Sequence, residues 1–214
     1  MRRGHPVFAR LYPRFAAAME RGGGSEHRDA LLAGAYGRAI EIGAGSGMNF
    51  TDYPAKVDEV LAVEPEPRLR ALAEAAARTA PVPVTVTAGV AEALPAEDAT
   101  FDTAVACLTL CSVDDREAAL SELFRVLKPG GHLHVFEHVR ARGVALARAQ
   151  RLLDATVWPV LNGGCHLASD TRGAITRAGF TEVELRDVTW PETRIPFPAS
   201  PHILGTATRP RQAG

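Results

Sequence analysis

A glycine-rich stretch, Gly43-Ala44-Gly45-Ser46-Gly47, directly follows an apolar run at 39–42. Glycine permits a tight turn and lets a ligand approach the backbone closely, so the pattern predicts a strand, a ligand-binding turn and then a helix. A dinucleotide fingerprint would need a third glycine at position 48, where this chain has Met48. The stretch disfavours a pyrophosphate ligand, and a turn that binds nothing would have the same local pattern.

An acidic residue stands at the end of the next predicted strand. Glu64 follows the β-branched and apolar run at 59–63 and lies 21 positions after Gly43. A carboxylate at this separation can accept hydrogen bonds from both hydroxyls of a ribose. Turn and acid together therefore favour a nucleoside-containing ligand over a solvated charge at a strand end.

Alternating strand and helix patterns surround these residues. Strands are predicted at 38–42, 59–63, 82–88, 101–107, 131–137, 181–187 and 202–207. Helices are predicted at 6–20, from Asp114-Asp115 to the stop at Lys128-Pro129-Gly130-Gly131, and at 171–178. This order is typical of an α/β, doubly wound fold: a seven-stranded, mostly parallel sheet with helices on both faces.

Composition limits the classes of protein to be considered. The chain has 214 residues, of which 46% are hydrophobic, so we expect a single domain over 1–214. A formal net charge of −1 gives no basic field for nucleic acid. Three cysteines favour a reducing, cytoplasmic location, and no long apolar run follows the N-terminus, so we expect no membrane span. The oligomeric state stays open.

Four motifs in order resemble those of the class I S-adenosylmethionine-dependent methyltransferases, whose fold is Rossmann-like. The resemblance covers roughly residues 36–207. It implies S-adenosylmethionine as cofactor and methyl transfer as activity. The residues it places at the cofactor are Glu41, Gly43, Ala44, Gly45, Gly47 and Asn49 in the first motif, Glu64 and Pro65 in the second, Ala91 and Glu92 in the third, and Cys107 and Leu108 after the fourth strand. Leu127-Lys128-Pro129-Gly130-Gly131 is similar to the turn before the fifth strand.

Within that class the chain looks closest to the methyltransferase-like 7 family of alkyl thiol methyltransferases. The residues that carry this likeness include Cys107-Leu108-Thr109-Leu110-Cys111-Ser112-Val113, Glu137-His138-Val139, Trp158-Pro159 and Gly164-Cys165. Two departures stand out. The apolar N-terminal anchor of the membrane-associated members is not found here, and Val90 replaces the Asp that many class I enzymes place against adenine.

The acceptor site is predicted in an insertion at 139–169, beneath an N-terminal helical lid within 1–30. His138 and His166 are the candidate general bases, and Asp154 could orient one of them or bind the substrate. Tyr12 with Phe15 could cover the site, and Trp158 and Cys165 could line it. For each of these residues, ordinary packing or solvent exposure is the competing interpretation.

Several functions remain open on the sequence alone. We prefer S-methylation of a small thiol, which reacts as thiolate. The rivals are C- or O-methylation of a quinone-like or natural-product aromatic, and binding of the cofactor without transfer; a nicotinamide-dependent oxidoreductase is the weakest. A metal site is not expected, because the spacing of His132, His134, His138, Cys165 and His166 matches no zinc pattern.

Overall fold

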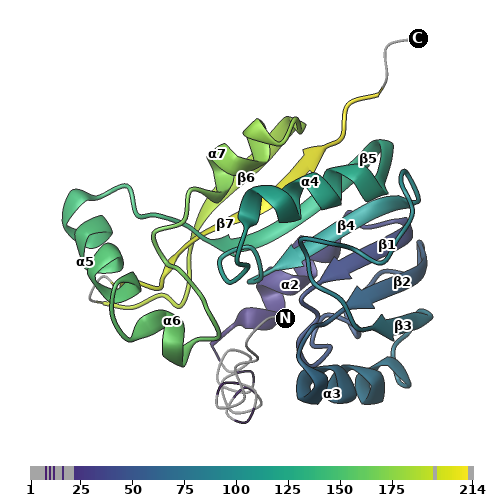
Figure 1. The fold of residues 1–214 in the computed structure, drawn as a ribbon, viewed down its shortest axis with the longest axis horizontal. Coiled ribbons are helices and arrows are strands. Elements are labelled where there is room, and N and C mark those ends of the chain that lie inside the picture. The colour runs from purple at the N-terminus through teal and green to yellow at the C-terminus, as the bar shows by residue number, and fades with distance from the viewer. Residues whose placement is uncertain are drawn as a thin grey trace.

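A computed structural model of the chain describes residues 22–194 and 197–211, together with Phe8, Arg10, Tyr12 and Ala16. Its strands and helices follow the predicted alternation (Figure 1). In chain order they are α2 Gly24–Leu32, β1 Gly37–Ile42, β2 Val57–Val63, α3 Pro67–Ala77, β3 Val84–Thr87, β4 Phe101–Cys107, α4 Arg116–Val126, β5 Leu127–His138, α5 Val144–Asp154, α6 Trp158–Leu161, α7 Thr171–Arg177, β6 Thr181–Thr189 and β7 Pro201–Thr208.

The seven strands form one sheet in the order β3-β2-β1-β4-β5-β7-β6. Strands β1 to β5 pair in parallel, and β7 pairs antiparallel with both β5 and β6. The prediction of a seven-stranded, mostly parallel α/β sheet is confirmed. Because the order reverses between β1 and β4, their carboxyl ends meet at the switch point where such sheets bind ligands.

Two apolar layers bury the sheet on both faces. Along β1, Ile40 and Ile42 pack with α4 and α7, whereas Ala39 packs with α2 and α3 on the opposite face. Side chains of a strand alternate between faces, so a strand covered on both sides needs apolar residues at successive positions. This accounts for the unbroken apolar runs in the sequence and fixes the strand ends from which the site is built.

One predicted element is wrong in type. The helix expected after the glycine turn is replaced by consecutive turns over residues 45–52. Hydrogen bonds from Gly47 N to Ala44 O (2.9 Å) and from Phe50 N to Gly47 O (3.1 Å) span three residues instead of four. The reason is the backbone of Gly47, whose φ of +81° cannot continue a right-handed helix.

The remaining elements agree with expectation within a few residues. Helix α4 begins after Asp115, whose side chain accepts a hydrogen bond from Ala118 N at 3.0 Å, and it ends just before Leu127, where β5 begins directly. The predicted helix at 6–20, and Phe15 with it, lies largely outside the described residues. Within 22–194 and 197–211, no helix is long and apolar enough to cross a bilayer.

Candidate functional site

The glycine turn lies where β1 ends and is fastened to β2. Gly43 N donates to Val63 O at 2.8 Å. Gly43 and Gly45 have φ values of +62° and +58°. A β-carbon on Gly43 would come within 2.5 Å of Thr109, and one on Gly45 within 2.7 Å of the Tyr12 hydroxyl. The left-handed backbone favours glycine, and a β-carbon would clash with these neighbours, so the shape of the turn depends on both residues.

Glu64 faces the glycine turn from the end of β2. Its carboxylate is 4% exposed and accepts hydrogen bonds from Gly45 N at 2.8 Å and from Glu66 N at 2.9 Å. Burial raises the pKa of Glu64 above its ordinary value, although these two backbone donors oppose the shift. A carboxylate offers about four lone-pair sites, so two remain for hydroxyl groups of a ligand.

Glu41 is a second buried carboxylate, near the end of β1. It accepts hydrogen bonds from Asn49 Nδ2 and from the Tyr53 hydroxyl, both at 2.8 Å. Burial raises its pKa to about 7, against these two hydrogen bonds. The nearby thiol of Cys107 has its pKa raised by burial as well and remains protonated. Glu41 is therefore partly ionised near neutral pH, and a bound cation would favour its charged form.

Glu137 of β5 holds the segment that follows β4, although the sequence pattern did not indicate a functional role for it. Leu108 adopts a left-handed φ of 55°, which redirects the chain. Three successive amides, those of Thr109, Leu110 and Cys111, then donate to the carboxylate of Glu137 at 2.7, 2.8 and 3.2 Å. Glu137 is fully buried, and this burial raises its pKa to about 7. Glu137 thus fixes the backbone on which Thr109 and Cys111 stand.

The insertion after β5 is fastened to the same segment. The Asp154 carboxylate accepts hydrogen bonds from Leu167 N at 2.7 Å and Ala168 N at 2.8 Å. His166 N donates to Cys111 O at 2.8 Å, so the chain around Cys165 runs beside Cys111. Asp154 therefore shapes the insertion rather than facing a ligand.

A cluster of three polar side chains, Cys111, His138 and Cys165, lies where β4, β5 and the insertion meet. His138 Nδ1 is 3.6 Å from the sulfur of Cys111 and 3.6 Å from the sulfur of Cys165. Hydrogen bonding from the Cys111 thiol, followed by that of His138, lowers the pKa of Cys165 to about 5 against the effect of burial. The pKa of Cys111 is raised correspondingly by its hydrogen bond to Cys165.

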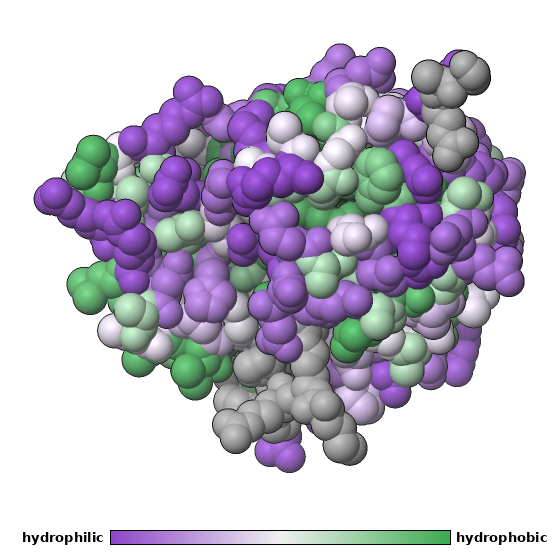
Figure 2. Space-filling model, turned by 45° about the horizontal axis from the view of Figure 1, so that its top comes forward, coloured by the Kyte–Doolittle hydropathy of each residue, from purple (hydrophilic) through white to green (hydrophobic). Residues whose placement is uncertain are grey.

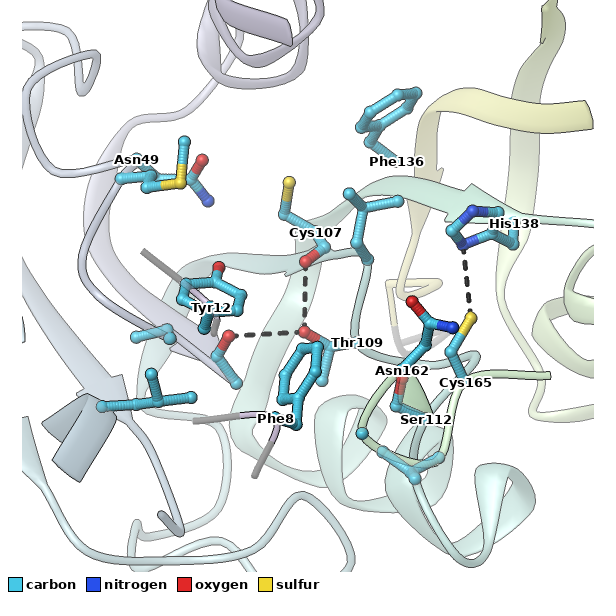
Figure 3. A pocket seen from close by; sticks show the side chains of 18 of the residues that line it. Phe8, Tyr12, Asn49, Cys107, Thr109, Ser112, Phe136, His138, Asn162 and Cys165 are labelled. Atoms are coloured by element: carbon cyan, nitrogen blue, oxygen red, sulfur yellow. Dashed lines mark hydrogen bonds between the residues drawn. The ribbon is translucent and has the colours of Figure 1, made fainter. Parts of the chain in front are cut away.

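The glycine turn, Glu41, Glu64, His138 and Cys165 line one continuous cavity of about 1120 Å³. Figure 3 shows Asn49, Tyr12 and Cys107 on one side and His138 and Cys165 on the other. We call the part lined by residues up to 114 the cofactor end, and the part lined by residues from β5 onward the acceptor end. The acceptor end is lined by Phe136, His138, Trp158, Asn162, Gly163, Cys165, Trp190, Pro191, Phe197, Ala199 and His202.

Most of the predicted site residues line this cavity. Those at the cofactor end are Glu41, Gly43, Ala44, Gly45, Asn49, Glu64, Pro65, Ala91, Cys107, Leu108 and Tyr12. Of the predicted acceptor residues, His138, Trp158 and Cys165 line it. The turn, the acid and the predicted insertion therefore do meet in one place.

Four predicted residues do not line the cavity. His166 is exposed, and Asp154 binds the insertion backbone as described above, so the base prediction now concerns His138 alone. Glu92 Oε1 accepts a hydrogen bond from Asp114 N at 2.9 Å, close to the start of α4. A β-carbon on Gly47 would meet Ala76 of α3 at 2.9 Å, so this glycine serves packing of the turn.

Sequence reasoning missed the residues contributed by the end of the chain. Trp190 and His202, from the β6–β7 region, line the acceptor end although they follow the insertion by more than twenty residues. Trp190 follows the end of a predicted strand, and Pro201-His202-Ile203 belongs to the resemblance to the methyltransferase-like 7 family, but neither signal assigned these residues a role. The antiparallel pairing of β7 with β5, which places His202 opposite His138, could not be inferred from either signal.

Comparisons with known proteins agree with this geometry. Residues 40–135 match the family model described as a methyltransferase domain. A thiol S-methyltransferase, TMT1B of Rattus norvegicus, is 34% identical over 175 residues, which cover 79% of this chain and 70% of that protein. The chain belongs to the thiol S-methyltransferase family. It is therefore an enzyme that transfers a methyl group from S-adenosylmethionine.

The chain is also similar to a methyltransferase of known structure and, over a short segment, to a quinone methyltransferase. A crystal structure of an S-adenosylmethionine-dependent methyltransferase from Thermotoga maritima matches with a TM-score of 0.68 and 26% identity, covering 95% of this chain and 98% of that one. The ubiquinone/menaquinone biosynthesis C-methyltransferase UbiE of Edwardsiella ictaluri is 48% identical, but over only 59 residues, which are 28% of this chain and 24% of that protein. The family member thus shares its overall fold with the former and a short segment with the latter.

The residues at the cofactor end fit S-adenosylmethionine. Gly43 and Gly45 line the cavity, and because they carry no side chain, their backbone is accessible to a ligand. Glu64 has lone pairs left for ribose hydroxyls, and the buried carboxylate of Glu41 suits a ligand that carries positive charge.

Proposed function

We propose that this enzyme transfers the methyl group to the sulfur of a small, apolar thiol. The observation that carries the proposal is the character of the acceptor end. None of its described lining residues is an aspartate, glutamate, lysine or arginine, whereas Phe136, Trp158, Trp190 and Phe197 give it aromatic walls. Apolar walls with few polar groups favour an alkyl or aryl acceptor over a charged one.

The residues of the cofactor end would hold S-adenosylmethionine through Glu64, Glu41 and the backbone of the glycine turn. When bound, this cofactor supplies a methyl group on a sulfonium, which a nucleophile can attack in line. The chain's own contribution is to exclude water and to align the acceptor sulfur. Cys107 supports this division of roles: its raised pKa keeps it protonated, so it does not compete for the methyl group.

The position of the acceptor sulfur is proposed beside His138. This histidine and Cys165 form the polar part of an otherwise aromatic end. A thiol must lose its proton before attack, and a hydrogen bond from the His138 imidazole stabilises the resulting thiolate better than the aromatic walls do. The insertion closes over this position through Trp158 and Asn162.

The experiment is a product analysis by mass spectrometry with isotope-labelled S-adenosylmethionine and a panel of alkyl thiols, aryl thiols and phenols. We expect labelled thioethers and little or no product from phenols. His138→Asn should lower thiol turnover at least about tenfold while leaving cofactor affinity unchanged, since His138 lies at the acceptor end. His166→Asn, with an exposed side chain, is the matched control. Labelling of phenols or carbon centres alone would refute the thiol acceptor and favour aromatic methylation.

A further inference from the structure

Two thiols and one imidazole converge at the acceptor end from three separate parts of the chain. Cys111 follows β4, His138 ends β5, and Cys165 follows α6. Both sulfurs lie 3.6 Å from the same nitrogen, His138 Nδ1, and the three atoms all lie within 4.8 Å of one another. Figure 3 shows the histidine ring directed at the Cys165 sulfur.

These separations are those of ligands around a small tetrahedral cation. Zinc binds cysteine sulfur at about 2.3 Å and histidine nitrogen at about 2.0–2.1 Å, so tetrahedral geometry places sulfur and nitrogen about 3.6 Å apart. The Cys111 and Cys165 distances to His138 both have this value. Two sulfurs and one imidazole are also the donor set that favours zinc over calcium or magnesium, which prefer oxygen.

The backbone around the three residues holds them without using their ligand atoms. Glu137 accepts the amide of Cys111, and Cys165 N donates to Asn162 O at 3.1 Å. Cys111 and Cys165 are buried, with 1% and 6% exposure, but the sulfur of Cys165 and the ring of His138 reach the cavity wall. Such a site is preorganised, so little conformational entropy of the chain is lost when an ion binds.

A neighbouring histidine provides an independent indication of a polar ligand. The ring of His202 lies 4.3 Å from that of His138, and its Nδ1 donates to Ser200 O at 2.9 Å. Its other nitrogen, Nε2, is therefore an acceptor. This atom is buried and has no hydrogen-bond partner among the described residues, although His202 lines the cavity. Buried polar atoms are nearly always paired, so the acceptor end is built to receive a hydrogen-bond donor such as a metal-bound water.

We propose that Cys111, His138 and Cys165 form a binding site for a thiophilic divalent cation, zinc in the first place. Three protein ligands leave the fourth tetrahedral position open toward the cavity, which is the arrangement of catalytic rather than structural zinc sites. A second step rests on the proposed function: the acceptor thiol occupies the fourth position through its sulfur and releases its proton to solvent as the metal–sulfur bond forms.

The test uses the 214-residue chain, stripped of metal and kept reduced with a phosphine under anaerobic conditions. Cobalt(II) is the probe, because thiolate coordination gives a sulfur-to-cobalt charge-transfer band and tetrahedral geometry gives strong visible bands. We expect one cobalt per chain, displaced by zinc. Cys111→Ser, Cys165→Ser and His138→Asn should each weaken binding more than about tenfold, since even outer-shell changes at metal sites cost about that much. Cys107→Ala and His166→Asn should bind cobalt as the wild type does.

Each of the three ligand variants is checked for folding by circular dichroism and by its affinity for S-adenosylhomocysteine, whose proposed site is the cofactor end. Absence of the cobalt bands in the wild type would overturn the metal site. So would bands that persist in all three ligand variants, or a mass two hydrogens lower that shows a Cys111–Cys165 disulfide under the same reducing conditions.

The acceptor step has its own readout, separate from turnover. Adding butanethiol to the cobalt-loaded protein should increase the charge-transfer band, and an unchanged spectrum would refute thiol binding at the fourth position. Metal-free protein that methylates thiols at the full rate would refute the metal's role and leave the proposed function standing. Protein that binds cobalt but gives no thioether would keep the site and refute the proposed function.

Discussion

Glu64 is the residue whose removal should most weaken cofactor binding. Its carboxylate already accepts two backbone hydrogen bonds, from Gly45 and Glu66, and keeps about two lone-pair sites for ribose hydroxyls. A hydrogen bond to a charged group contributes about 1.5–3 kcal/mol. Two such bonds contribute about 3–6 kcal/mol, so Glu64→Ala should weaken binding between about 10²- and 10⁴-fold.

Glu64→Gln separates charge from shape. Glutamine keeps one acceptor oxygen and replaces the other by an amide group that can donate to a hydroxyl oxygen, so the loss should be intermediate, about 10- to 100-fold. Isothermal titration calorimetry with S-adenosylhomocysteine measures both affinities without turnover. Glu59→Gln is the control on the same strand: this half-exposed residue pairs with Arg38 at 2.6 Å and does not line the cavity.

Folding of the variants can be judged independently of binding. Burial raises the pKa of Glu64, which means that its ionised form costs stability in the ligand-free protein at neutral pH. Glu64→Gln should therefore melt no more than a few degrees below the wild type. An affinity within about twofold of wild type in a folded Glu64→Ala protein would refute the assignment of Glu64 to the ribose.

Three further predictions concern the frame of the site. Gly43→Ala should lower cofactor affinity more than about tenfold by calorimetry, because the new β-carbon would press on Thr109 at 2.5 Å. Gly205→Ala should destabilise the protein by about 2–4 kcal/mol in denaturant unfolding, since its β-carbon would overlap the carbonyl oxygen of Glu184. The pKa of Glu41 is about 7 in the folded chain against an ordinary 4.5, so its contribution to stability falls as pH rises between these values. Glu41→Gln should therefore gain stability relative to wild type from pH 4.5 to 8, by at most about 3 kcal/mol, and a pH-independent difference would contradict this.

The cofactor end could be predicted from the sequence because its residues lie in short motifs that follow strands. In a parallel sheet the end of a strand and the turn that follows it are adjacent in the sequence. The spacing of Gly43, Gly45 and Glu64 was therefore enough to predict a ligand site at the strand ends. The pattern failed at Gly47, where a left-handed backbone produces turns instead of a helix. A glycine in the sequence permits such a conformation but does not require it.

The acceptor end could be predicted only in part, because its residues are brought together by tertiary contacts. Cys111 and Cys165 are each 27 positions from His138, far beyond the short spacing of a recognisable metal pattern. The hydrogen bonds that align them, from Cys111 N to Glu137 and from His166 N to Cys111, join parts of the chain that the sequence leaves unconnected. The sequence therefore indicated His138 and His166 equally as candidate general bases. The fold distinguishes them, because His138 lines the cavity and His166 does not.

The two ends of the cavity are supported by different parts of the fold. The cofactor end rests on β1, β2 and the turns after them, packed between α2, α3 and α4. The acceptor end rests on β5, β7 and the insertion, where Cys111, Cys165 and Leu167 pack in a small cluster of their own beside Leu153 and Trp158.

Figure 2 shows apolar side chains at the left edge of the molecule, where α5 and α6 of the insertion lie in Figure 1. Because this apolar cluster is separate from the two main layers, we expect substitutions in the insertion to change the acceptor without disturbing the glycine turn or Glu64. Glu137 links the two ends of the cavity. Its carboxylate, on β5, accepts hydrogen bonds from the amides of both Thr109, at the cofactor end, and Cys111, beside the acceptor end.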